Sequence, residues 1–209
     1  MPGWCSSRGV FEPLAPRCAA RRRTLALEWR GHGRTQTPAS DFGASDLVED
    51  ALAVIAASGA QNVVPVALSH AGWVAIELRR RLGARIPKLV LLDWIILEAP
   101  PPFLGALQSL QDSTQWQQTR EQLFGMWLEG VDSAELTRFI REDMGSYPFA
   151  MWARAGREIA AAYATDASRR INCDYERRGF VTRLTNAIII CAPSNLGLRP
   201  ETNGHEPGT

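Results

Sequence analysis

Between residues 24 and 94 the sequence alternates between short apolar runs and amphipathic stretches, and this alternation constrains the fold more than any other feature. The apolar runs, rich in Val, Leu and Ile, are typical of buried strands, whereas the amphipathic stretches repeat their apolar residues at helical spacing. Strands that alternate with helices form a parallel sheet with crossover connections. The chain is therefore predicted to have an α/β fold with a mostly parallel sheet. In chain order the predicted elements are a strand at 24–29, a helix at 46–58, a strand at 62–68, a helix at 73–82 and a strand at 88–94.

After residue 100 the pattern becomes almost entirely helical. A helical block inserted after a sheet strand is a common way to cover an active site, so we expect a helical cap over about 100–165 on a core that spans 1–168. Periodicity is poor after residue 169, and 169–209 is expected to be an unrelated, poorly ordered tail in which only 180–184 and 187–191 could form strands. Within the cap the predicted helices are 103–110, 114–128, 133–144 and 149–163.

Composition excludes several classes of protein. Hydrophobic residues make up 45% of the chain and charged residues 22%, which is typical of a globular protein. No apolar run approaches the roughly 18–20 residues that span a bilayer, so we expect a cytoplasmic protein without a membrane partner. Four cysteines without CxxC spacing and only three histidines predict no metal site and no disulfide framework. The basic N-terminal segment is interrupted by Glu12 and Glu28, which argues against a nucleic-acid arm.

The segment Ala67-Leu68-Ser69-His70-Ala71-Gly72 lies between a predicted strand and a predicted helix. A nucleophile elbow needs small residues two positions before and after the nucleophile because the turn is tight, and Ala67 and Ala71 meet that demand. The alternative is that Ser69 only caps the helix that starts near His70. The strand–turn–helix context favours the elbow.

Two further segments could complete a site around Ser69. The Pro2-Gly3-Trp4-Cys5 segment could supply one backbone N–H of an oxyanion hole, with the other N–H coming from His70. Asp93 ends a predicted strand, where a carboxylate can orient a catalytic histidine. Taken alone, the first segment reads as an ordinary turn, and Asp93 as a residue that caps the next element.

The sequence offers no convincing catalytic base. His32 lies early in the chain and in a predicted turn, His70 follows Ser69 directly, and His205 lies five residues from the C-terminus in the predicted tail. Trp127, on a predicted cap helix, either packs in the core of the cap or forms an aromatic wall for a flat substrate.

These residues together resemble the cofactor-free 2,4-dioxygenases of the α/β-hydrolase fold, which act on 3-hydroxy-4(1H)-oxoquinolines. The likeness runs from about Pro2 to Ser168, and the combination of PGWC, SHAGW and LLDW is its most specific part. The matching segments are PGWC (2–5), WRGHG (29–33), SDFG (40–43), DAL (50–52), SHAGW (69–73), LLDW (91–94), W-L-x-G (127–130) and the stretch 141–163.

The resemblance implies a chemistry and a set of roles. Family members cleave a heteroaromatic ring with O₂ as co-substrate and release carbon monoxide, without metal or flavin. A His–Asp pair deprotonates the 3-hydroxyl of a small flat aromatic substrate, and the anion then reacts with O₂. By position, Asp93 would be the acid partner and Ser69 would hydrogen-bond the substrate. Trp4 and His70 would line the oxyanion pocket, and Trp127 would contact the ring from the cap.

The sequence departs from this family in ways that affect function. Leu68 and Ser6 stand where members tend to carry histidine, Met1 directly precedes Pro2, and the region with the catalytic histidine is not recognisable. We therefore expect a truncated or mis-spliced version of the family fold, with little activity. The alternatives are a serine hydrolase that uses Ser69 to cleave an ester or amide, and a catalytically dead remnant; the oligomeric state is not readable.

Overall fold

The computed structural model describes residues 1–93 and 99–164, together with the backbone of 181–184 and 187–191. Its sheet has the strand order β1-β2-β4-β3. β1 and β2 are parallel, with Ala67 beside Leu91, whereas β4 runs antiparallel to both β2 and β3. The α/β fold is confirmed: the parallel pair β1–β2 forms one end of the sheet, and the antiparallel hairpin β3–β4 extends it beyond β2. The strands are β1 (Val66–Leu68), β2 (Lys88–Leu92), β3 (Val181–Leu184) and β4 (Ala187–Cys191).

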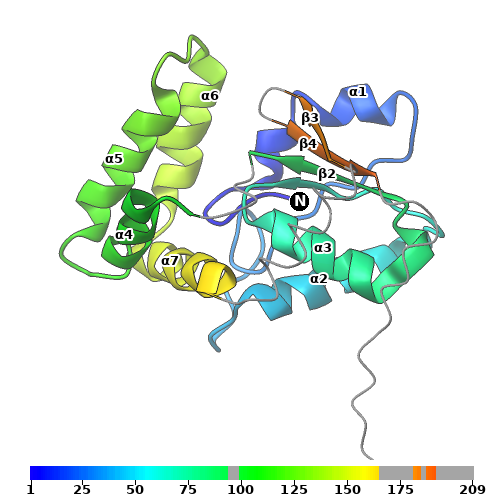
Figure 1. Cartoon of the computed structure of the whole chain (residues 1–209), viewed down its shortest axis with the longest axis horizontal. Helices are drawn as coiled ribbons and strands as arrows, with labels where there is room; N and C mark the ends of the chain where they lie inside the picture. Colours follow the sequence, from blue (N-terminus) through cyan, green and yellow to red (C-terminus); the bar gives the residue numbers. More distant parts are fainter. Residues whose placement is uncertain (94–98, 165–180, 185–186, 192–209) are drawn as a thin grey trace, which may run out of the picture.

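Two amphipathic helices, α2 (Ala44–Ser58) and α3 (Ala71–Leu82), lie on one side of the sheet (Figure 1). The backbone N–H of Gly43 donates to Asp46 Oδ2 over 2.9 Å at the start of α2, and Gly59, with a φ of 67°, ends it. α3 ends at Gly83, after three arginines that suit the negative end of the helix dipole. These helices match the predicted helices to within two residues at each end.

Two predicted strands differ from the structure. Pro65 has no N–H to donate, so the run 62–68 forms only the short strand β1, although the Pro65 carbonyl still accepts from Val90 N at 2.9 Å. The segment 24–29 is not a strand, and Leu25 within it is exposed. The Trp29 carbonyl accepts a hydrogen bond from His32 N in the turn that follows, at 3.0 Å. β-prone residues alone do not make a strand without a neighbouring strand to pair with.

The helical cap is present and gathers beside the sheet, at the left of Figure 1. Its helices pack closely where α4 and α7 meet at Gly156. Glycine has no Cβ, and a Cβ placed there in ideal geometry would lie only 2.5 Å from the Leu107 carbonyl oxygen. The cap contains α4 (Pro101–Ser109), α5 (Trp116–Leu128), α6 (Ala134–Arg138), a π turn (Phe139–Asp143), a 3-10 turn (Met144–Ser146) and α7 (Phe149–Ala164). The short helices outside it are η1 (Arg8–Phe11), α1 (Ala15–Ala19) and η2 (Gly83–Arg85).

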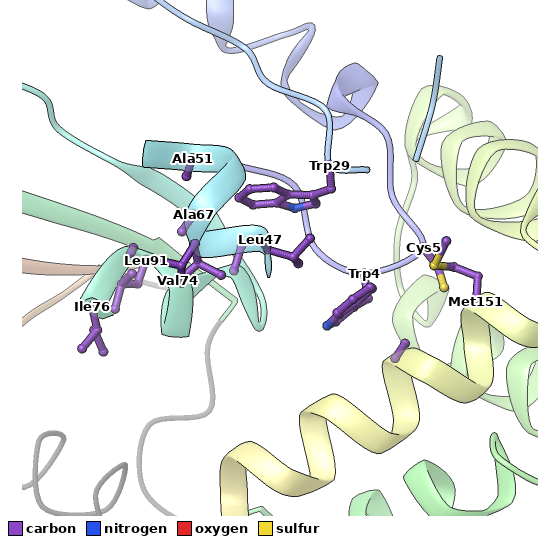
Figure 2. Close-up of a cluster of buried hydrophobic side chains, with 14 of the residues drawn as sticks. Trp4, Cys5, Trp29, Leu47, Ala51, Ala67, Val74, Ile76, Leu91 and Met151 are labelled. Atoms are coloured by element: carbon purple, nitrogen blue, oxygen red, sulfur yellow. The ribbon is translucent and has the colours of Figure 1, made fainter. Parts of the chain in front are cut away.

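One continuous hydrophobic core connects the sheet to the cap. Figure 2 shows it running from Leu91 in the sheet through Leu47 and Trp29 to Trp4, with Met151 of α7 at its far side. Trp29 is fully buried, and its indole N–H donates to the Pro2 carbonyl at 2.7 Å. Residues 2–7 are buried, and this part of the N-terminus is therefore anchored in the core.

Charged residues hold α7 against the start of α2. The Arg154 guanidinium lies 2.8 Å from the Asp41 carboxylate and stacks over the Phe42 ring at 4.1 Å. Glu158 accepts from the backbone N–H of Ala44 at 2.8 Å, where the positive end of the α2 dipole favours a carboxylate. The cap and the core are thus joined by polar as well as apolar contacts. None of the helices in the described part of the chain is long and apolar enough to cross a membrane.

Candidate functional site

Three non-glycine residues in the left-handed backbone region follow three neighbouring extended segments. They are Cys5, Ser69 and Asp93, with φ values of 52°, 52° and 49°. Met1 pairs with β1 in parallel fashion, since its amine donates to the Val66 carbonyl at 2.7 Å and its own carbonyl accepts from Leu68 N at 3.0 Å. Each left-handed residue costs roughly 1–2 kcal/mol, so a cluster of them indicates a functional edge of the sheet.

Ser69 has the backbone that a nucleophile elbow requires. Its N–H donates to the Leu92 carbonyl at 2.8 Å, which fixes the turn to the end of β2. Ala67 and Ala71 are fully buried, as the tight turn demands. The residue that caps α3 is His70, whose side chain makes no capping hydrogen bond. The geometry therefore favours the elbow over the simple helix cap, while the chemical role of Ser69 stays a prediction.

Trp4 and His70, predicted to line an oxyanion pocket, lie against each other. Their rings stack with centroids 5.1 Å apart, and the Trp4 backbone N–H donates to His70 Nδ1 at 3.2 Å. Trp4 also stacks on Phe42 at 5.8 Å. Within the described part of the chain, the buried atoms Trp4 Nε1 and His70 Nε2 have no hydrogen-bond partner. Buried polar groups are normally paired, so these two are candidate contacts for a ligand.

His32, set aside as a turn residue from the sequence, is fully buried and belongs to the same cluster. Its Nε2 accepts the Cys5 backbone N–H at 3.1 Å, and its Nδ1 lies 2.9 Å from the Arg30 carbonyl oxygen. Gly31 and Gly33, with φ of 70° and 52°, let the chain turn on both sides of the ring. The Gly-His-Gly spacing was the available signal that this histidine turns inward.

Two cap residues that sequence reasoning missed hold the other side of the cluster. The Tyr147 hydroxyl accepts from Gly33 N at 3.0 Å, and burial raises the pKa of Tyr147 to about 12. Asp143 Oδ2 accepts from Ser7 N at 3.0 Å. Both contacts join residues more than 100 positions apart in sequence, so no local pattern pointed to them.

The other predicted site residues are less closely gathered. Asp93 is exposed and directly follows β2, at the same sheet edge as Ser69. Trp127 is half-buried in the cap, where its ring lies 5.9 Å from Phe124. His205, Trp94 and most of the predicted tail lie outside the described residues. The structure thus brings together Trp4, Ser69 and His70, and places Asp93 nearby in the fold.

Neither described histidine is free to act as a base. Both His32 nitrogens are engaged, and His70 Nδ1 accepts the Trp4 N–H. Burial lowers the pKa of both histidines, and it lowers that of His70 well below its usual value. Residues 1–93 and 99–164 hold no cluster of His, Cys, Asp or Glu that could bind a metal ion. Proton abstraction would need a group outside this cluster.

The site combines three features that together define a class of enzyme fold. They are an elbow at a strand–helix turn, a loop beside that elbow, and a helical cap over the carboxyl edge of a parallel pair of strands. A family model described as "Alpha/beta hydrolase family" matches residues 1–196, and the chain belongs to that family.

Within this family, the chain is similar to quinolone dioxygenases. It is 37% identical over 166 residues to the 2-heptyl-3-hydroxy-4(1H)-quinolone dioxygenase of Mycobacteroides abscessus and to the 1H-3-hydroxy-4-oxoquinoline 2,4-dioxygenase of Pseudomonas putida. Each match covers 79% of this chain and 62% of the relative. The solved structure of AqDC, which recognises and cleaves the ring of the Pseudomonas quinolone signal, superposes with a TM-score of 0.77 at 37% identity, covering 81% of this chain and 66% of AqDC. The chain thus spans less than two thirds of these relatives, and the resemblance seen in the sequence is confirmed.

Proposed function

We propose that this chain carries the substrate-binding part of a ring-cleaving 2,4-dioxygenase that needs neither metal nor flavin. The substrate would be a 3-hydroxy-4-oxoquinoline or a similar flat heteroaromatic, with O₂ as co-substrate. The observation that carries the proposal is the 37% identity over 166 residues to two dioxygenases, a match that covers 79% of this chain. A resemblance limited to the fold would not reach that identity.

The proposed reaction begins with removal of the proton from the substrate 3-hydroxyl. The resulting anion gives an electron to O₂, and the peroxide that forms closes onto the ring carbonyl carbon. The O–O bond and the two ring C–C bonds that flank the 3-carbon then break. That carbon leaves as carbon monoxide with the substrate's own 3-oxygen, and the two oxygen atoms of O₂ remain on the two carbons that the peroxide had bridged. The protein contributes by binding the anion and stabilising the charge that develops on its oxygens.

The proposed roles follow from the position of each residue. Ser69 would hydrogen-bond the substrate. The Trp4–His70 pair would meet the substrate oxygen atoms with Trp4 Nε1 and His70 Nε2, two buried atoms that have no partner among the described residues. Asp93, at the end of β2, would orient a base. Trp127 would cover the ring from the cap.

The test separates binding from turnover. Because neither described histidine can serve as base, we expect the 209-residue protein to bind 3-hydroxy-4-quinolone under anaerobic conditions and to turn it over very slowly in air at neutral pH. Added imidazole, or a pH at which the substrate ionises by itself, should raise O₂-dependent release of carbon monoxide. Ser69→Ala should weaken binding, and Gly125→Ala, on an open face of α5, is the control. Absence of anaerobic binding by the unmodified protein would refute the proposal.

A second function is favoured by one observation, the left-handed backbone of Ser69. A serine at an elbow can attack an ester or amide carbonyl. Covalent labelling of Ser69 by a fluorophosphonate, with release of product from a p-nitrophenyl ester and no oxygen dependence, would support a hydrolase. Oxygen-dependent loss of quinolone absorbance without ester cleavage would support the dioxygenase.

A further inference from the structure

Two consecutive backbone N–H groups of the 2–5 loop are held by imidazole rings from two distant parts of the chain. The Trp4 N–H donates to His70 Nδ1 at 3.2 Å, and the Cys5 N–H donates to His32 Nε2 at 3.1 Å. The histidines lie 66 and 27 positions away in sequence. All four residues are buried, so water does not compete for these hydrogen bonds.

The hydrogen-bond partners assign a tautomer to each ring. A backbone N–H can only donate, so the ring nitrogen that receives it has no proton. His32 Nδ1 lies 2.9 Å from the Arg30 carbonyl, which can only accept, so the proton of His32 is on Nδ1. In His70 the acceptor is Nδ1, so the proton is on Nε2. The two rings therefore carry their protons on opposite nitrogens.

Both rings need to be neutral for this arrangement. A protonated imidazole would present an N–H to the N–H of the loop and break the contact. Burial lowers the pKa of both histidines, and the nearby Arg154 also lowers that of His32, while Asp143, Glu28 and the Arg30 carbonyl act in the opposite direction. The neutral state is thus the one that the surroundings favour.

The loop that these rings hold lies directly beside the elbow. An ideal Cβ on Gly3 would lie 3.5 Å from the Leu68 carbonyl oxygen and 3.5 Å from the Ser69 Cβ. Cys5 has a left-handed φ of 52°, which an unconstrained chain would seldom adopt. A fixed external acceptor for each N–H explains how the loop keeps this shape next to Ser69.

We propose that His32 and His70 are positioning residues that hold the 2–5 loop beside Ser69 as two neutral imidazoles in opposite tautomers. Neither acts as the base of the reaction. The part of the proposal that concerns ligand binding rests on the proposed function, whereas the tautomers do not.

The tautomers can be measured directly, without any turnover. Long-range ¹H–¹⁵N spectra of the ¹⁵N-labelled full chain at neutral pH distinguish a protonated from an unprotonated ring nitrogen. We expect a protonated Nδ1 in His32 and a protonated Nε2 in His70, with single variants assigning the signals. Two rings of the same tautomer, or a charged ring at neutral pH, would overturn the proposal.

Substitutions by amides test the positioning role. The side-chain oxygen of Asn reaches about as far as Nδ1 and that of Gln about as far as Nε2, so His70→Asn and His32→Gln keep an acceptor for the loop. His70→Leu and His32→Leu remove it. We expect the Leu variants to bind 3-hydroxy-4-quinolone anaerobically about tenfold more weakly than their amide counterparts, roughly the effect of one hydrogen bond.

The controls separate the positioning role from folding and from the proposed function. Urea unfolding of all four variants identifies any that do not fold, and the comparison is made between folded pairs. Equal binding by His70→Asn and His70→Leu, both folded, would overturn the positioning role. If the unmodified protein binds no quinolone, the proposed function fails, while the opposite tautomers can still be found in the spectra.

Discussion

The close contact between α4 and α7 makes Gly156→Ala a sharp test of how the cap is packed. An ideal Cβ at Gly156 would lie 2.5 Å from the Leu107 carbonyl oxygen and 3.3 Å from both Leu110 Cβ and Gln111 Cγ. Ordinary contacts of a Cβ begin at 3.4 Å, so the backbone of α4 would have to move by nearly an ångström. The obstructing atom belongs to a helix backbone, which cannot rotate away as a side chain can.

The expected magnitude follows from two opposing effects. Replacing glycine by alanine inside a helix stabilises it by about 1 kcal/mol. Overpacking a filled contact costs about 1–3 kcal/mol, and the backbone contact at Gly156 belongs at the upper end of that range. We therefore expect Gly156→Ala to lower the free energy of unfolding by about 1–2 kcal/mol.

Two other cap glycines provide matched controls. Gly105 in α4 and Gly125 in α5 have no heavy atom within 4 Å of an ideal Cβ. Gly105→Ala and Gly125→Ala should therefore raise the free energy of unfolding by up to about 1 kcal/mol. Urea unfolding, followed by circular dichroism at constant m-value, measures all three variants. If Gly156→Ala is as stable as the two controls, α4 and α7 do not pack as described.

Two further predictions concern buried titratable groups. The folded His70 has a lowered pKa, so only the unfolded state takes up its proton as the pH falls below about 6.5, and stability is lost in that direction. Between pH 7.5 and 5.5 the unmodified protein should lose about 1 kcal/mol more than His70→Asn in urea unfolding, and equal losses would show that His70 is not buried neutral. Burial raises the pKa of Cys5 well above its usual value, whereas Cys18 is only half-buried. Iodoacetamide should therefore modify Cys18 at least about 100-fold faster than Cys5 in the native protein, as peptide mass spectrometry can show, and rapid loss of the Cys5 thiol would contradict the buried loop.

Local patterns predicted the helices and the elbow well because their signals are contained within a few residues. The helix 46–58 was found from its apolar spacing, with Asp46 near its start and Gly59 at its end. Ala67 and Ala71 pointed to the elbow in the same way. The predicted helix 133–144 is instead broken into α6, a π turn and a 3-10 turn. This break was not predicted, because a π turn changes the hydrogen-bond pattern of the backbone while its residue types are those of an ordinary helix.

The features that were missed depend on contacts between distant residues. The run 24–29 has strand-forming residues, but no described strand pairs with it, so its strand propensity had no effect. His32 accepts the Cys5 N–H and Tyr147 accepts the Gly33 N–H. The two glycines beside His32 indicated a tight turn, but nothing next to either residue in sequence indicated its partner. The roles predicted for Asp93 and Trp127 came from family resemblance, and they stay predictions.

The three left-handed residues at the sheet edge have a consequence for protein engineering. Glycine at position 5, 69 or 93 would relieve backbone strain, and a search for thermostable variants would be drawn to those positions. Each such gain would delete the side chain, and the proposed function gives a role to the side chains of Ser69 and Asp93, so we expect stability to rise and the proposed activity to fall. Thermostability is better sought at Gly105 and Gly125, whose open surroundings lie away from that edge. The left-handed backbone at these three positions is therefore a strain that the proposed function gives a reason to retain.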